Sequence, residues 1–284
     1  MRTIGFIDYY LDEWHANNYP AMIRNGRYKD EFDVVLAWEK IRKEGKKPID
    51  VWCAEQGVAQ ASSLEEVVEK CDCIVVLSPD NPEQHEELAD LPLRSGKPVY
   101  IDKPFAPTLD AARRLFAKAE AHGTPLMSSS ALRFGSEIQQ AARDLAGQRV
   151  SLVSTHGGGA FQLYAIHQLE MLVMLMGTDA TRVMQCGAPT APVMLINYPD
   201  ARRGLVHVIS GHPFQLSAQY GEGQALVINT MNDFFDRFLD GMLEFFSTGV
   251  SPIPPAQTLE IAALVETGIK ALETPDRWVP VPAI

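Results

Sequence analysis

Short apolar segments alternate with helical patterns along the first 130 residues of the chain. Apolar runs predict strands at residues 3–7, 32–38, 73–77, 99–101 and 126–128. Helical patterns fall between them at residues 13–25, 64–70, 83–91 and 109–122. Ser63 and Glu66 form a capping box at the start of one helix. This alternation is typical of a doubly wound parallel sheet, whose ligands bind beyond the carboxyl ends of the strands.

The pattern changes after about residue 135, where strands are grouped together and flanked by helices. Strands are predicted at residues 149–155, 182–186, 191–197 and 204–210. Helices are predicted at residues 136–146, from the triple glycine at 157–159 to 176, and at 231–246 and 259–272. We therefore expect an α/β chain of two domains. The first, over residues 1–130, is a Rossmann-type doubly wound sheet, and the second, over residues 131–284, is of the α+β class.

Charge and composition narrow the classes of partner. The net charge of −11 disfavours nucleic acid and anionic membrane surfaces, which need clustered Lys and Arg. The longest later apolar run, residues 171–176, is far shorter than the roughly 20 residues of a membrane span. The four cysteines contain no CxxC pair and the seven histidines no ligand spacing, so no metal is expected. A soluble, cytoplasmic protein is the expectation.

Four stretches of the sequence carry a family resemblance: "DCIVVLSPDNPEQHEELA", "GKPVYIDKPFAPTLDAARRLFAKAEAHG", "GGGAFQLYAIHQLEMLVMLMG" and the C-terminal helix pair from "FFDRFLDGM" to "ETGIKALET". Together they resemble the glucose–fructose oxidoreductase, inositol dehydrogenase and MocA family. The resemblance implies a Rossmann domain that binds NAD or NADP. It also implies a second domain with an open, mainly antiparallel sheet, often used for contact in a homo-oligomer. The implied reaction is hydride transfer between a nicotinamide and a sugar or polyol carbon.

The resemblance also indicates which residues would carry the chemistry. Lys103 matches the family's lysine and would orient the substrate hydroxyl and stabilise negative charge on its oxygen. His167 lies on the helix after the triple glycine and would act as general base. Leu163 stands where the family has an Asp, so Tyr164, three residues before His167, is the candidate for support. Each of these roles has a structural alternative. Asp102 and Lys103 could be a solvated pair in a loop, and His167 could be a hydrogen-bonded histidine of the core.

The cofactor cleft is expected at the ends of three strands. Its predicted lining is Ile7, Asp8, Tyr9 and Tyr10 after the first strand, Ser78, Pro79 and Asp80 after the third, and Asp102 after the fourth. His85 either lies near the nicotinamide or is a surface helix histidine. Glu39 follows the second strand and would bind the adenosine ribose, or would be an exposed helix-start residue.

The expected Gly-x-Gly-x-x-Gly is missing, because no glycine occurs between Gly5 and Gly26. Asp8, Asp12 and Glu13 bring negative charge to the place where glycines would admit a pyrophosphate. Acidic residues there also complement a helix dipole. Three hypotheses remain: a dehydrogenase with an unusual dinucleotide loop, a non-redox relative that binds a sugar-like ligand or nucleotide, and a lyase or isomerase.

Overall fold

The computed structural model describes residues 1–284, which divide into two compact units. The first unit comprises residues 1–106, 110–128 and 239–253. The second comprises residues 107–109, 129–238 and 254–284. A segment late in the sequence, residues 239–253, therefore packs with the first unit.

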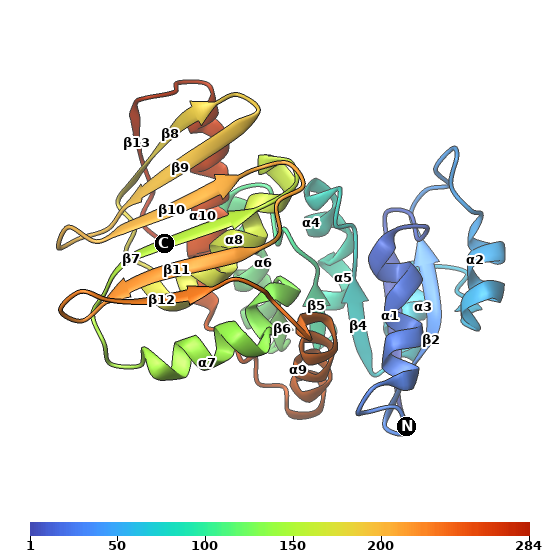
Figure 1. The fold of residues 1–284 in the computed structure, drawn as a ribbon. Helices are drawn as coiled ribbons and strands as arrows, with labels where there is room; N and C mark the ends of the chain where they lie inside the picture. The colour runs from blue at the N-terminus through green and yellow to red at the C-terminus, as the bar shows by residue number, and fades with distance from the viewer. The chain divides into compact units, whose positions relative to one another are not determined.

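The first unit contains a six-stranded, fully parallel sheet in the order β3-β2-β1-β4-β5-β6 (Figure 1). The strands are β1 (Arg2–Asp8), β2 (Phe32–Glu39), β3 (Ala59–Gln60), β4 (Cys73–Val76), β5 (Val99–Ile101) and β6 (Leu126–Met127). Every residue of β4 and β5 is buried, as expected for parallel strands covered on both faces. The predicted Rossmann-type sheet is confirmed.

Helices connect the parallel strands. They are α1 (Trp14–Asn25), α2 (Ile49–Gln56), α3 (Leu64–Lys70), α4 (His85–Leu88), α5 (Asp90–Leu93) and α6 (Leu109–Ala121). The single helix predicted for residues 83–91 is wrong. The structure has a 3₁₀ turn (Pro82–Gln84) and then α4 and α5, because Pro92 has no N–H to continue one helix through this segment. The helix α2 and the short strand β3 were not predicted.

The capping box is confirmed in part. Ser63 Oγ accepts a hydrogen bond from Glu66 N at the start of α3, at 3.3 Å. The Glu66 carboxylate returns to the backbone and hydroxyl of Ser62, one residue before the expected partner. The cap satisfies N–H groups that the first turn of a helix leaves free.

The second unit contains a mixed sheet of seven strands in the order β12-β11-β7-β10-β9-β8-β13 (Figure 1). Its strands are β7 (Val150–Gly157), β8 (Arg182–Ala188), β9 (Ala191–Asn197), β10 (Arg203–Val208), β11 (Gln215–Tyr220), β12 (Gln224–Ile228) and β13 (Trp278–Pro280). Only β7 and β10 pair in parallel, so the predicted open, mainly antiparallel sheet is confirmed. The strands β11, β12 and β13 were not predicted.

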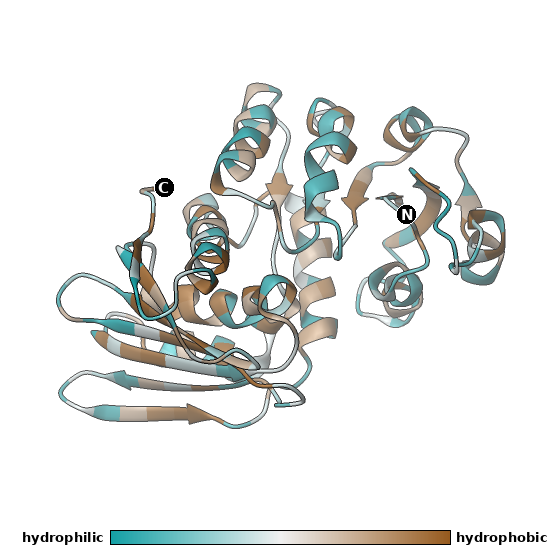
Figure 2. Cartoon of the chain, turned by 90° about the horizontal axis from the view of Figure 1, so that it is seen from above, coloured by the Kyte–Doolittle hydropathy of each residue, from teal (hydrophilic) through white to brown (hydrophobic).

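One face of the second sheet carries the core of this unit. Helices α8 (Phe161–Met176) and α10 (Pro255–Leu272) lie behind the strands in Figure 1 and pack on one another and on β7 and β8. Buried and partly exposed residues alternate along β10 and along most of β7. Figure 2 shows strands banded in apolar and polar colours. The other helices are α7 (Ser136–Asp144) and α9 (Phe234–Thr248), of which α9 continues into the first unit after Phe238. None of the helices is both long and apolar enough to span a membrane.

Candidate functional site

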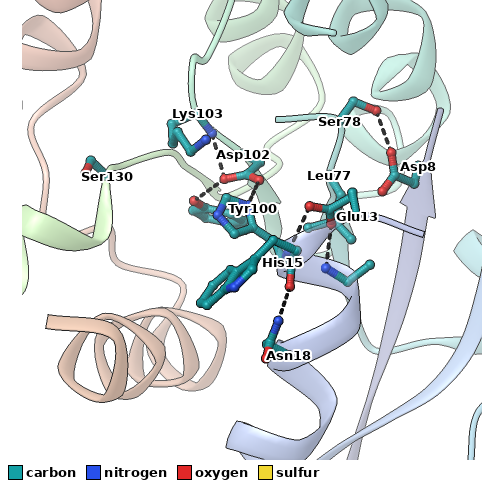
Figure 3. Close-up of polar contacts among 12 residues, drawn as sticks. Asp8, Glu13, His15, Asn18, Leu77, Ser78, Tyr100, Asp102, Lys103 and Ser130 are labelled. Atoms are coloured by element: carbon teal, nitrogen blue, oxygen red, sulfur yellow. Dashed lines mark hydrogen bonds and ion pairs between the residues drawn. The ribbon is translucent and has the colours of Figure 1, made fainter. Parts of the chain in front are cut away.

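Polar side chains gather where three neighbouring strands of the first unit end. Asp8 is the last residue of β1, Ser78 follows β4, and Asp102 follows β5. Because β1 pairs with β4 and β4 with β5, their carboxyl ends meet at one edge of the sheet. Figure 3 shows these residues together with the first turn of α1. The edge therefore combines several buried acidic groups with hydroxyl and imidazole groups.

Asp8 is tied to Ser78 and to its own loop. Ser78 Oγ donates to Asp8 Oδ1 at 2.9 Å and accepts from Tyr9 N at 2.9 Å, while Tyr10 N also reaches Asp8 Oδ1 at 3.3 Å. These bonds hold Ser78 at φ +78°, a conformation that costs energy for a residue with a Cβ. Asp8 is 1% exposed and its Oδ2 has no partner. Burial, followed by the nearby Glu13, raises the pKa of Asp8 well above its usual value.

The tyrosines after Asp8 lie along the same loop. Tyr10 is buried, and its hydroxyl donates to Asp80 Oδ2 at 3.4 Å. The Lys43 ammonium lies 4.0 Å from the centre of the Tyr10 ring, and that of Lys40 lies 5.8 Å from the Tyr9 ring. Asp80 and Tyr10 are thus in direct contact, as two predicted lining residues. Ile7 is fully buried within β1, and Pro79 lies between Ser78 and Asp80.

Glu39, the predicted ribose ligand, binds the chain itself. Its carboxylate accepts a hydrogen bond from the backbone N–H of Leu11 at 3.0 Å. Burial raises the pKa of Glu39, and the bond from Leu11 opposes that shift. The alternative of an exposed helix-start glutamate is wrong, because Glu39 is the last residue of β2 and is only partly exposed. Its carboxylate binds the loop that follows β1.

Glu13 closes the same loop by capping α1. Its carboxylate accepts hydrogen bonds from the backbone N–H groups of His15, at 2.7 Å, and Ala16. Asn17 N continues the helix by donating to the carbonyl oxygen of Glu13 at 3.0 Å. Glu13 is only 6% exposed. Burial raises the pKa of Glu13 to about 7, with Asp102 adding to that effect and His15 opposing it.

Asp102 is the centre of a buried network (Figure 3). One of its oxygens pairs with His15 Nδ1. The other accepts from Tyr100 Oη at 3.1 Å and from Lys103 N at 2.8 Å. Burial alone would raise the pKa of Asp102, but His15 and then Lys103 lower it to about 2. The environment therefore keeps Asp102 ionised while it makes Glu13 far easier to protonate.

His15 was missed by the sequence reasoning. Its ring stacks on Tyr19 with centroids 5.0 Å apart and an interplanar angle of 11°, and it joins α1 to the end of β5. A histidine in the first turn of a helix, after strand 3–7, was the available signal. Its partner lies 87 residues further along the chain, so the sequence alone could not identify the pair.

Lys103 is positioned through its backbone. Its N–H is fixed by Asp102, and a cis peptide bond joins it to Pro104. The side chain is partly exposed, and its ammonium group makes no hydrogen bond or ion pair. The alternative of a solvated Asp102–Lys103 pair is wrong for Asp102, which is fully buried.

His85 is fully buried, so the alternative of a surface helix histidine is wrong. Its Nδ1 lies 3.0 Å from the carbonyl oxygen of Phe105, and its Nε2 lies 2.7 Å from that of Leu77. The ring therefore links the loop after β4 to the loop after β5. Burial lowers the pKa of His85.

In the second unit, His167 lies on α8 beside a serine. Its Nδ1 lies 2.7 Å from Ser130 Oγ, and the Tyr164 ring meets its ring edge-on at 5.4 Å. Tyr164 is 44% exposed and packs over Gly159, where an added Cβ would lie 2.1 Å from the Tyr164 ring. Ser130 was not singled out from the sequence.

A buried ion pair supports Ser130. Its backbone N–H donates to Glu170 Oε1 at 3.1 Å, and the other oxygen of Glu170 accepts from Arg133 Nε. Arg133 also donates to Gln257 Oε1 at 2.6 Å. Arg133 and Glu170 are both buried, so their pairing fixes the segment that presents Ser130 to His167.

A wide hollow of roughly 630 Å³ lies in the second unit against α7 and β12. Arg143, Val227 and Arg237 are among its lining residues, and none of the predicted site residues lines it. The structure contains no group of three or more His, Cys, Asp or Glu side chains that could hold a metal ion.

Comparisons with known proteins agree with the fold. Residues 16–130 match the GFO_IDH_MocA family model, described as an oxidoreductase family with an NAD-binding Rossmann fold. The match begins at Ala16, so β1 and the loop after it lie outside the matched residues.

Two curated bacterial proteins are similar over part of the chain. The uncharacterized oxidoreductase YhhX of Escherichia coli (strain K12) is 28% identical over 134 residues, which cover 41% of this chain and 39% of that protein. The uncharacterized protein y4oX of Sinorhizobium fredii is 27% identical over 152 residues, which cover 46% of this chain and 41% of that protein. The matches thus span only about two fifths of those relatives.

A solved structure matches over the whole length. Myo-inositol dehydrogenase from Lactobacillus casei, in complex with NAD(H) and myo-inositol, has a TM-score of 0.82 and 12% sequence identity. The alignment covers 100% of this chain and 97% of that one. At this identity the likeness establishes the fold.

Proposed function

We propose that the protein is an NAD(P)-dependent oxidoreductase, because residues 16–130 match the model of the GFO_IDH_MocA oxidoreductase family, which has an NAD-binding Rossmann fold. Its substrate would be a hydroxyl group of a sugar, a polyol or a related compound. The observation that carries the proposal is the set of polar residues at the ends of β1, β4 and β5, where folds of this class bind their ligands.

Lys103 is the residue proposed to bind and orient the substrate hydroxyl. Asp102 accepts a hydrogen bond from the backbone N–H of Lys103, and no hydrogen bond or ion pair holds the Lys103 ammonium group, which leaves this group available to bind a substrate oxygen. The charge of Lys103 also lowers the pKa of Asp102, after the larger effect of His15. A positive group at that place stabilises negative charge that develops on the hydroxyl oxygen. Asp102, held ionised by its environment, would keep this loop in one conformation.

His167 is the proposed acceptor of the hydroxyl proton. Ser130 engages Nδ1, so proton transfer is assigned to Nε2. Tyr164 is proposed as packing support, because its ring contacts the imidazole. The roles of Lys103 and His167 belong to different units and are tested separately.

The loop after β1, where the pyrophosphate of the coenzyme would bind, is occupied by contacts within the chain. When bound, a nicotinamide dinucleotide accepts or donates a hydride. In the folded chain, however, the N–H groups of the first turn of α1 are already bonded to Glu13, and Glu39 is bonded to Leu11. The residues of this loop therefore do not fit a pyrophosphate in the conformation seen. The same observation favours the second candidate function, a non-redox protein that binds a sugar-like ligand or nucleotide.

We further propose a cytoplasmic homo-oligomer. All four cysteines are free thiols, which suits a reducing compartment. The seven-stranded sheet of the second unit is open at both edges and has one face free of the α8 and α10 layer, a surface suited to another copy of the chain.

The test begins with the fluorescence of NADH and NADPH titrated with the purified protein. A panel of polyols and sugars that includes myo-inositol and scyllo-inositol is then screened for nicotinamide reduction. For an active substrate, Lys103→Ala should lower kcat/KM about 100-fold or more, and Lys70→Ala, on an exposed helix position of the same unit, should leave it unchanged.

The outcomes separate the hypotheses. Unchanged turnover of Lys103→Ala would remove Lys103 from the mechanism. No binding of either dinucleotide at millimolar concentration would favour the non-redox protein. Product formation without any change in nicotinamide absorbance would indicate a lyase or isomerase.

A further inference from the structure

The helix that follows the first strand of a Rossmann sheet provides a place for the pyrophosphate of a dinucleotide. The phosphate oxygens accept from backbone N–H groups of the first helical turn, and glycines allow close approach. In this chain that place is at the start of α1, directly after the loop Asp8–Glu13.

The chain binds them with its own carboxylate. Glu13 accepts from the N–H groups of His15 and Ala16, the same donors that a phosphate would use. It is 94% buried, since 6% of its surface is exposed, so this cap is an internal contact. The two carboxylate oxygens of Glu13 each accept from one backbone donor, which is the arrangement that the oxygens of a bound anion would make.

A second contact holds the loop in the same conformation. Leu11 N, two residues before Glu13, donates to the Glu39 carboxylate at 3.0 Å. Glu39 is the acidic residue at the end of β2 where the ribose of a dinucleotide is expected. The loop therefore forms hydrogen bonds with both sets of groups that a dinucleotide would need: the N–H groups expected to bind its phosphates and the carboxylate expected to bind its ribose.

A third observation concerns Asp8, which stands at the end of β1 where the glycine-rich turn would begin. Its Oδ2 is buried and has no hydrogen-bond partner. A buried polar atom without a partner carries an energetic cost, which a rearrangement of the loop would relieve. The side chains of Asp8 and Tyr10 also occupy space that glycines would leave open.

We propose that the Glu13 carboxylate occupies the pyrophosphate position of the dinucleotide site, and that a dinucleotide binds only when the loop Asp8–Glu13 moves away. Glu13 is then an internal competitor of the coenzyme and sets its affinity. This inference rests on the proposed function, because it takes the ligand of that site to be a dinucleotide. The loop and β1 are also the part of the Rossmann unit that lies outside the family match.

The experiment compares the wild-type chain with Glu13→Ala, Glu13→Gln and Ser63→Ala. Ser63→Ala is the matched control, because it removes the side-chain cap of α3 in the same unit. Two ligands are titrated, NADH by fluorescence and inorganic pyrophosphate by the ¹⁵N–¹H shifts of the His15 and Ala16 amides. Melting temperatures of all four proteins show whether each one folds.

Glu13→Ala should bind both ligands about tenfold more tightly or better, because the competing charge-assisted bonds are gone. The affinity of Glu13→Gln should lie between those of Glu13→Ala and the wild type, since the amide keeps one acceptor oxygen and loses the charge and the second acceptor. Ser63→Ala should lower the melting temperature without changing affinity. If Glu13→Ala does not fold, the comparison of Glu13→Gln with the wild type decides in the same way.

Equal or weaker binding of both ligands by the Glu13 variants overturns the inference. If the wild type binds NADH as tightly as the Glu13 variants, the inference fails while the proposed coenzyme survives. If pyrophosphate binding tightens and shifts the two amides but NADH does not bind, the anion position is confirmed and the proposed function loses its coenzyme.

Discussion

The pair formed by Ser130 and His167 allows a quantitative test of the proposed proton acceptor. Ser130 is fully buried, and its Oγ lies 2.7 Å from His167 Nδ1. For Nε2 to accept a proton, Nδ1 must carry the ring proton and donate it to Ser130 Oγ. Ser130→Ala removes this acceptor, and with it the hydrogen bond that favours the tautomer with the proton on Nδ1.

The size of the effect follows from the single bond that is lost. A neutral hydrogen bond contributes about 0.5–1.5 kcal/mol, which corresponds to an about 2- to 12-fold smaller population of the productive imidazole. We therefore expect kcat to fall by about that factor in Ser130→Ala. His167→Asn removes the base itself and should lower kcat by about 100-fold or more.

The variant also affects stability, because Ser130 Oγ accepts from Leu132 N at 3.2 Å. Loss of such a cap costs about 1 kcal/mol, so kinetics are measured well below the melting temperature. Ser151→Ala is the control, since this exposed hydroxyl of the same unit bonds only to Gln219 O. Steady-state assays on the substrate found in the screen give kcat and KM separately.

An independent readout does not need turnover. ¹⁵N chemical shifts of the His167 imidazole report which ring nitrogen carries the proton, and Ser130→Ala should shift the balance between the two tautomers. If kcat and the tautomer balance both stay at the wild-type values, Ser130 does not position His167. A loss as large as that of His167→Asn would show that the hydroxyl takes a direct part in the reaction.

Two further predictions concern groups outside the proposed chemistry. Burial raises the pKa of Glu260 to about 7, so the folded state binds more protons than the unfolded state between pH ~4.5 and 7, and the free energy of unfolding should fall by about 3 kcal/mol across that window. In Glu260→Gln, the free energy of unfolding measured by urea should lose most of this dependence on pH. The same dependence on pH in the variant and the wild type would contradict the assignment to Glu260. In native thiol titration at pH 8 only Cys186 should react quickly, because the other three cysteines are buried and burial raises the pKa of each thiol to about 11 or 12. Cys186→Ser should abolish the fast phase, and a second fast thiol would show that the core opens.

The sequence predicted the elements whose patterns are strong. Continuous apolar runs located β1, β4 and β5, and the carboxyl ends of these strands placed Asp8, Ser78 and Asp102 at one edge. Weak patterns were missed. In the segment containing β11 and β12, apolar and polar residues alternate only over residues 215–220, and Gly221 and Gly223 interrupt the pattern before β12.

Contacts between distant segments were beyond the sequence. His15 meets Asp102, and Ser130 meets His167, across 87 and 37 residues respectively. Neither pair has a local spacing that a motif could describe. Each depends on how a helix crosses the end of a strand or loop, which is decided by packing of the whole unit.

The acidic residues at the start of α1 could be predicted from the sequence only in part. Acidic residues near a helix start were expected to complement the dipole, and Glu13 does so by capping. Asp12 does not, because its carboxylate binds Asn17 Nδ2 at 3.0 Å and Lys47 N at 3.1 Å. The sequence shows that the glycine-rich loop is missing. It does not show that the Glu13 carboxylate binds the N–H groups of the first helical turn in place of a phosphate. Only the fold shows that a carboxylate of the chain takes the donors that a dinucleotide phosphate would need, which turns a missing motif into a competition that can be measured.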